Sequence, residues 1–240
     1  MNSLLYGLID SLALLPILLF AWWKSGVRHP KAAWFLVFLG LLVLDAIAIL
    51  LPVEYHINLN FFQWNWFGKA LSLAWALMFI MFGPLTRREV GMVRSRANSR
   101  KLAWLVVGIA VVACAIGDYL AGPLKPSAQT LAFQLTMPAI SEEIVYRGIL
   151  LAVLARAFRE NEFPSRFYLG WSVWITAIAF GLGHSLQVSH GHFHFYPLAF
   201  IFPFAFAALA GWLRKYTGSL VLPIVMHSGI DFAAAAVGFI

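Results

Sequence analysis

The stretch AWFLVFLGLLVLDAIAILL, residues 33–51, decides the fold class. It holds one charged side chain, Asp45, in 19 residues. A helix that crosses the hydrocarbon core of a bilayer needs about 20 mostly apolar residues, whereas a membrane barrel strand shows about ten residues of alternating polarity. The stretch therefore predicts a membrane-spanning helix.

The whole chain shares this apolar character. Of its 240 residues, 62% are apolar and 11% are charged, against about 45–50% and about 25% in an ordinary soluble domain. One soluble core cannot bury so much apolar surface. This excludes a cytosolic enzyme, a disordered protein and a nucleic-acid-binding domain. We predict an all-α, polytopic transmembrane helical bundle that is surrounded by the lipid bilayer and has no nucleic-acid partner.

About eight spans can be drawn along the chain, with Pro16 inside the first and Pro138 interrupting the fifth. We expect residues 1–129, with four spans, and residues 130–240, with four more, to form one integrated membrane domain. The one cysteine, Cys114, excludes an intrachain disulfide and a cysteine-cluster metal site. The predicted spans are residues 4–23, 33–51, 61–83, 102–121, 130–158, 168–188, 195–213 and 219–239.

The loops between these spans carry an asymmetric charge. Of the 17 Lys and Arg residues, 14 follow the first, third, fifth and seventh spans, and the opposite loops hold only Lys125. Basic loops of membrane proteins face the cytoplasm. We therefore expect both termini outside, in an integral protein of a prokaryotic plasma membrane, and we assign the net charge of +7 to orientation.

The fifth span contains the first polar motif, MPAISEEIVYRG, residues 137–148. Ionisable residues in a span are costly and mark functional sites. Glu143 and Arg147 are spaced i, i+4, so they share a helix face and can pair. Glu142 is rotated by about 100° from Glu143 and has no partner in its own helix. An unpaired, desolvated carboxylate suits proton transfer, although such a carboxylate could also simply bond a neighbouring helix.

Two further motifs follow on the sixth and eighth spans. FGLGH places Phe180 and His184 one helical turn apart, and HSGID does the same for His227 and Asp231. A carboxylate one turn from a histidine can orient its imidazole or join it in binding a metal. Each motif alone is weak evidence, because a single histidine in a span is often only a hydrogen-bonded core residue.

Other polar residues receive simpler interpretations. Asp45 and Asp118 stand singly in spans, where we expect them to be hydrogen-bond partners between helices. The histidines of HGHFH, residues 190–194, lie between the sixth and seventh spans. We interpret this segment as a loosely ordered interfacial loop rather than a metal site.

The three motifs in this order on successive helices resemble the CAAX prenyl protease and bacteriocin-processing family. Its members are glutamic intramembrane endopeptidases related to the type II CAAX endopeptidase. The stretch GWLRKYTGSLVLPIVMH, residues 211–227, also resembles the approach to the family's last motif. The resemblance covers about residues 130–235, and the first four spans show no motif of this kind.

The resemblance implies a polar cavity inside a helical bundle and the hydrolysis of a peptide bond in a membrane-associated or lipidated substrate. In the family, the first glutamate and the second-motif histidine activate a water, which here gives these roles to Glu142 and His184. The third motif lines the oxyanion site, here with His227 and Asp231. The residues that it implies as structural support are Glu143, Arg147 and Phe180.

Asp231 departs from the CAAX-processing members, which typically carry asparagine at this position. An ionised aspartate cannot donate a hydrogen bond to an oxyanion. Either Asp231 is protonated, or it holds His227 in a donor tautomer, and we favour the second explanation. The departure weakens the case for prenylated substrates more than the case for peptidase chemistry.

Three alternatives remain open. The first is a metal-dependent membrane protease, because two histidines and two carboxylates suit Zn²⁺; its ligands would be Glu142, His184, His227 and Asp231. The second is a non-catalytic peptide-binding or immunity protein, and the third is a proton-coupled transporter, against which we find no inverted-repeat halves. We expect a peptide or membrane-anchored protein as substrate, and no cofactor or metal.

Overall fold

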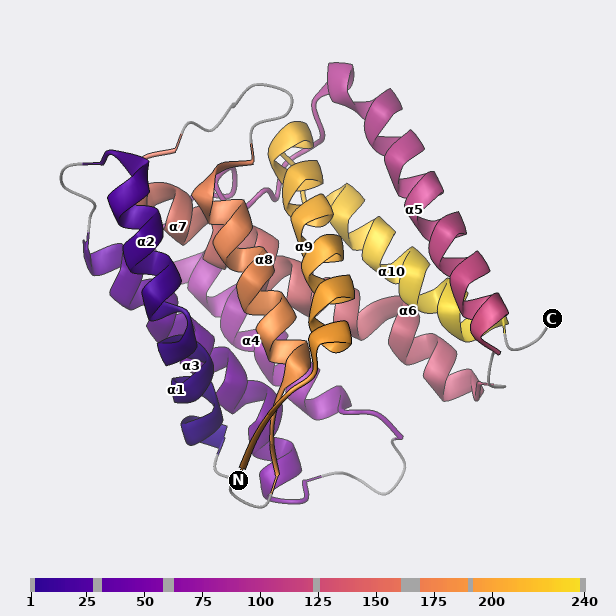
Figure 1. Ribbon diagram of the computed structural model, residues 1–240. Helices are drawn as coiled ribbons and strands as arrows, with labels where there is room; N and C mark the ends of the chain where they lie inside the picture. Colours follow the sequence, from indigo (N-terminus) through magenta and orange to yellow (C-terminus); the bar gives the residue numbers. More distant parts are fainter. Residues whose placement is uncertain are drawn as a thin grey trace.

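The computed structural model places a helix in each of the eight stretches predicted to span the membrane (Figure 1). It describes residues 3–27, 32–57, 63–122, 126–160, 169–189 and 192–237. The helices and strands, in chain order, are α1 Ser3–Ala13, α2 Leu15–Ser25, α3 Ala32–Glu54, α4 Trp66–Phe82, the short 3₁₀ turn η1 Ala97–Ser99, α5 Arg100–Ala121, α6 Ala128–Glu142, the π-helix η2 Glu143–Leu150, α7 Leu151–Ala157, α8 Gly170–Ser185, β1 Leu186–Ser189, β2 His192–Phe195, α9 Pro197–Thr217 and α10 Val221–Ala236.

The all-α membrane fold is thereby confirmed, with an approximate number of spans. Among the described residues, four helical stretches are long and apolar enough to cross a bilayer on their own, and α4 and α10 are shorter apolar helices. α1 and α2 together make the first predicted span, and Pro16 lies in the first turn of α2. The four long stretches are Leu4–Ser25, Ala33–Glu54, Ala97–Ala121 and Pro197–Thr217.

A two-stranded hairpin replaces the loop predicted between α8 and α9. β1 and β2 pair antiparallel, with His192 opposite Ser189 and His194 opposite Gln187. The amide of Tyr196 donates to the Ser185 carbonyl at 3.0 Å and closes the base of the hairpin. The prediction of a loosely ordered loop is therefore wrong for this part, while His190 lies outside the described residues.

The helices of the two halves of the chain pack against each other. α4 contacts α6, α3 contacts α7, and α10 lies between α5 and α6. Figure 1 shows α5 beside α10 at one side of the bundle, with α8 and α9 adjacent in the middle. Two clusters of buried apolar side chains form the core, and Tyr146 of η2 packs against both. The segment with the first polar motif is thus central to the bundle.

The helix that carries this motif changes its geometry at the motif. Residues 128–157 are continuously helical, but α6 gives way to a π-helix at Glu143. The amide of Glu143 is shared between the carbonyls of Ala139 and Ile140, four and three residues earlier. Pro138 lies one turn earlier and lacks the amide that an α-helix needs there. π-Helical turns occur frequently at functional sites.

Close packing between α8 and α9 depends on a glycine. A Cβ atom at Gly211 of α9 would lie 2.7 Å from Cγ1 of Val173 on α8. Valine is stiff at χ1, so it cannot easily move away. At Gly108 of α5, by contrast, a Cβ would meet no atom within 4 Å.

We expect Gly211→Ala to lower the free energy of unfolding by about 1–3 kcal/mol, the usual cost of overpacking a core. The matched substitution Gly108→Ala should leave stability unchanged or raise it slightly, because alanine favours the helix. Thermal unfolding of the two purified variants in detergent measures the difference. Equal melting temperatures would contradict the packing of α8 against α9.

Candidate active site

The first and third polar motifs meet at one imidazole, that of His227 on α10, and the ring of Phe180 from the second motif lies 6.3 Å from it between centroids. Its Nδ1 lies 2.8 Å from Oε1 of Glu143 in η2. Its Nε2 lies 3.9 Å from Oε2 of Glu142 at the end of α6 and 3.5 Å from Oδ2 of Asp231 one turn along α10. His227 itself is 6% exposed. Three carboxylates thus surround one buried histidine.

Glu143 and Arg147 form the ion pair that their spacing predicts. Arg147 Nη1 lies 3.1 Å from Glu143 Oε1, and the two side chains are 1% and 0% exposed. The same oxygen of Glu143 is bonded to His227 Nδ1. Since an ionised carboxylate only accepts hydrogen bonds, Nδ1 donates. Glu143 therefore does more than neutralise Arg147: it fixes the orientation of His227.

The guanidinium of Arg147 is held largely by aromatic rings. It lies 4.4 Å from the ring centroid of Phe180 and 5.3 Å from that of Phe206. Its Nη1 and Nη2 make no hydrogen bond to any described residue. Cation–π attraction is strongest where the ring and the cation are desolvated. This explains the position of Phe180 in the second motif, and Phe206 of α9 is a residue that the sequence analysis missed.

Glu142 has a partner that the sequence analysis missed. Its Oε1 forms an ion pair with Nζ of Lys69 on α4, and both side chains are 13% exposed. The expectation that Glu142 is unpaired is therefore wrong. Residue spacing along a helix predicts only contacts within that helix, whereas Lys69 comes from 73 residues earlier in the chain. The one available signal was a lysine inside an apolar span.

Asp45 joins α3 to α4 beside this ion pair. Its Oδ1 accepts hydrogen bonds from Ser72 at 2.5 Å and from Trp75 at 3.1 Å. Asp45 also interacts electrostatically with Lys69. The prediction that Asp45 is a hydrogen-bond partner between helices is confirmed. Asp118 makes no hydrogen bond to the part of the chain that the structure describes.

His184 lies at the last turn of α8 and is exposed. Its Nδ1 is 2.8 Å from the carbonyl oxygen of Phe180. Because a carbonyl can only accept, Nδ1 donates and the neutral ring keeps Nε2 as an acceptor. The ring is tilted by 39° against that of Phe180, with 4.5 Å between centroids, and His184 interacts electrostatically with Glu142. It therefore borders the site without a direct bond to the carboxylates.

Asp231 takes a different place from the one expected. It lies at Nε2 of His227, the nitrogen that faces Glu142, and its side chain is 25% exposed. The hydrogen bond that fixes the imidazole is donated by Nδ1, the opposite nitrogen, to Glu143. The expectation that Asp231 orients His227 is therefore wrong, because Glu143 orients the imidazole.

Within the described residues, no three His, Cys, Asp or Glu side chains are arranged as the ligands of a metal ion. Glu142 and Glu143 are instead engaged by Lys69 and Arg147. The arrangement is one of alternating positive and negative groups, which is suited to moving a proton and stabilising a charge.

Residues 124–233 match the model of the family described as Type II CAAX prenyl endopeptidase Rce1-like. The matched segment contains all three polar motifs, from Glu142 to Asp231, and confirms the resemblance on which the sequence analysis depends. No curated protein and no solved structure shows a significant match to the chain. Lys69 lies outside the matched segment.

We expect Glu143→Gln to lower the free energy of unfolding by about 3 kcal/mol or more. It leaves the Arg147 charge buried without its counterion, which typically costs about 3–5 kcal/mol, although glutamine can still accept from His227. Glu142→Gln should cost less, because Lys69 reaches partial solvent exposure. Denaturant or thermal unfolding in detergent compares the two variants. A Glu143→Gln protein as stable as wild type would contradict the ion pair.

Proposed function

We propose that this protein is an intramembrane endopeptidase in which Glu142 activates a water for attack on a peptide bond. The family match supports a CAAX-type intramembrane protease. The proposal that Glu142 activates the water depends on the contacts of its two carboxylate oxygens. Lys69 holds Oε1, while Oε2 faces His227 Nε2 across 3.9 Å and makes no hydrogen bond to a described residue.

The 3.9 Å between Glu142 Oε2 and His227 Nε2 fits a contact that is bridged by a water. Polar groups more than about 3.5 Å apart are often bridged by a water. A water bound at Glu142 Oε2 would lie beside His227 and within electrostatic reach of His184. In the proposed step, Glu142 takes a proton from this water while the water oxygen attacks the substrate carbonyl carbon. Glu142 then gives the proton to the leaving amine, which completes the hydrolysis.

His227 is suited to stabilise the oxyanion that forms. Its Nδ1 is committed to Glu143, so only Nε2 can face the substrate. Nε2 donates when the imidazole is protonated. Three carboxylates, from Glu142, Glu143 and Asp231, face the two permanent cations Lys69 and Arg147, and a protonated imidazole would make the cluster neutral. An oxyanion donor of this kind typically contributes about 10²–10³-fold to the rate.

The substrate class follows from the membrane and the family together. We propose a peptide or protein segment held at the membrane, with a prenyl or other lipid group as one source of that attachment. We place Asp231 beside the substrate, because it lies 3.5 Å from His227 Nε2 and its side chain is 25% exposed. The peptidase step itself needs no lipid group on the substrate.

We expect Glu142→Gln to reduce cleavage by at least about 10²-fold, the contribution of one positioned acid or base. Protein termini in the membrane and secreted proteome are compared between cells that make wild type, Glu142→Gln or Asp118→Asn at equal levels. A new terminus seen with wild type and Asp118→Asn, but not with Glu142→Gln, identifies the substrate. Purified protein is then tested on that peptide with and without a farnesyl group.

The same assay separates the competing mechanisms. Activity that survives removal of divalent metals by a chelator supports the glutamate mechanism, and activity restored only by Zn²⁺ overturns it. Matching terminus profiles for all three proteins would favour a binding protein. A folded, inactive Glu143→Gln beside an active Glu142→Gln would reverse the assignment of the two glutamates.

We further expect Lys69→Met to lower kcat by about 10²-fold with little change in KM. Lys69 acts through Glu142 as a positioning residue, and a small displacement of a reacting group can cost this much. Lys69→Arg should recover part of the activity, and Lys101→Met at the basic end of the bundle should have none of this effect. A loss confined to KM, or no rescue by arginine, would contradict a positioning role.

A further inference from the structure

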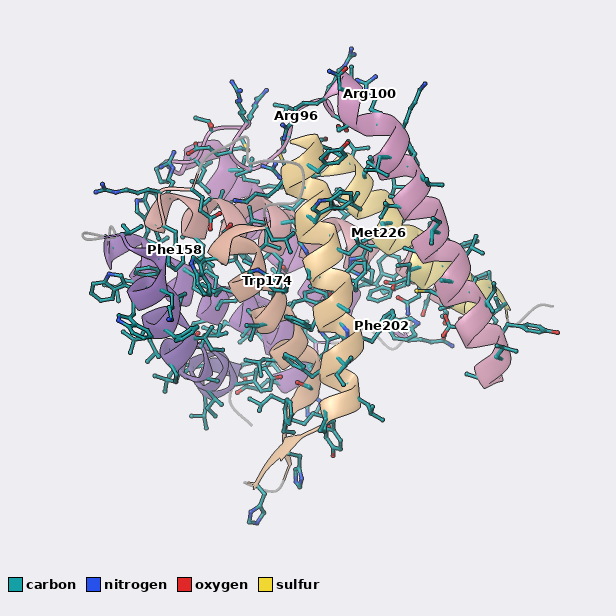
Figure 2. The ribbon with its side chains drawn as sticks, turned by 45° about the horizontal axis from the view of Figure 1, so that its top comes forward. Arg96, Arg100, Phe158, Trp174, Phe202 and Met226 are labelled. Carbon is teal, nitrogen blue, oxygen red and sulfur yellow. The ribbon has the colours of Figure 1, made fainter. Side chains whose placement is uncertain are left out.

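A cavity of about 690 Å³ lies at the end of the bundle where three basic segments meet. Its walls come from the segment between α4 and α5, from α7 and the residues that follow it, and from the end of α9. Figure 2 shows Arg96 and Arg100 at this end of the molecule, where α5 begins. None of the residues that line the cavity belongs to the candidate active site.

The lining of the cavity is strongly cationic. Seven Lys or Arg residues line it, against two carboxylates. Both carboxylates are already occupied: Glu89 lies 2.5 Å from Arg156 Nε, and Glu160 pairs with Lys215. Arg156 holds the pKa of Glu89 down to about 2, so the pair remains charged at physiological pH. An excess of five positive charges is left among the lining residues.

The cations deep in the cavity are positioned by the protein. Arg214, which is 6% exposed, donates to the carbonyls of Arg88 at 3.3 Å and Glu89 at 2.6 Å. Arg96 donates to the carbonyl of Lys215 at 2.5 Å. These bonds join α9 to the segment before α5. The cavity is therefore a built feature with fixed cationic walls and not a set of independent surface side chains.

Two cations at the cavity are not engaged in this way. The side chains of Arg94 and Arg159 are exposed, line the cavity, and make no hydrogen bond or ion pair with any described residue. They come from different walls, since Arg94 precedes α5 and Arg159 follows α7. Two guanidinium groups that line one cationic cavity can both bind one anion. Guanidinium groups match phosphate oxygens with paired hydrogen bonds.

We propose that this cavity binds a phosphate group between Arg94 and Arg159. The phosphate of an anionic phospholipid and a free phosphate share this chemistry. The lipid is favoured by the apolar residues of the lining, Val93, Leu151 and Ala152. Leu151 and Ala152 are each 3% exposed, so it is Val93, at 38%, that can contact a glycerol or acyl chain. Basic pockets between helices at the cytoplasmic face of membrane proteins bind lipid headgroups in this manner, and the loop charges predict that this end is cytoplasmic.

The experiment uses the full chain, purified in a neutral detergent and titrated with short-chain phosphatidylglycerol. Phosphatidylcholine and inorganic phosphate are titrated separately. The test variant is Arg94→Ala/Arg159→Ala. The matched control is Arg87→Ala/Lys101→Ala, which removes two charges from the same basic end but from residues outside the lining. Affinity is measured by the concentration dependence of the melting temperature.

Wild type and the control variant should bind phosphatidylglycerol with the same affinity. The test variant should bind it about 25-fold more weakly, because each arginine contributes about fivefold. The same pattern with inorganic phosphate instead supports a site for a soluble phosphate. Equal losses in both double variants would overturn the proposal, because they indicate diffuse surface charge. No ligand-dependent shift in wild type would overturn it as well. If the double variant fails to fold, Arg94→Gln and Arg159→Gln are measured singly, with about a fivefold loss expected for each.

Discussion

The carboxylate of Glu143 is the interaction on which the centre of this protein depends. It is fully buried and lies within reach of a guanidinium on its own helix and an imidazole on α10. A buried charge is tolerated only where it is paired, so this one group determines where Arg147 and His227 can lie. Arg147 in turn rests on the rings of Phe180 and Phe206, which ties α8 and α9 to the same point.

The π-helix gives this arrangement its geometry. A change of helix type at Glu143 alters the directions of the side chains that follow relative to those before it. Glu142 and Glu143 are adjacent in sequence, yet Glu142 pairs with Lys69 of α4 and Glu143 with Arg147 and His227. Two neighbouring carboxylates are therefore held by different partners, a condition under which one can be structural and the other reactive.

The centre of the fold and its basic end have different electrostatic character. The central cluster sets three carboxylates against Lys69, Arg147 and the imidazole of His227, because it lies among apolar helices where an uncompensated charge is expensive. The cationic cavity carries an excess of positive charge, which is tolerable only near water and headgroups.

Lys69 also shows that the N-terminal half takes part in the site, although the family match begins at residue 124.

The sequence by itself determined the fold class and those members of the central cluster that lie in the polar motifs, but neither Lys69 nor Phe206. Apolar runs of about 20 residues have few alternatives to membrane helices, and the i, i+4 spacing of Glu143 and Arg147 makes their pairing a local property of one helix. The sequence could not determine contacts between helices, because periodicity predicts which helix face a residue occupies but not which helix covers that face. Tertiary structure therefore decided that Lys69 neutralises Glu142, that Glu143 rather than Asp231 orients His227, and that three basic segments line one cavity.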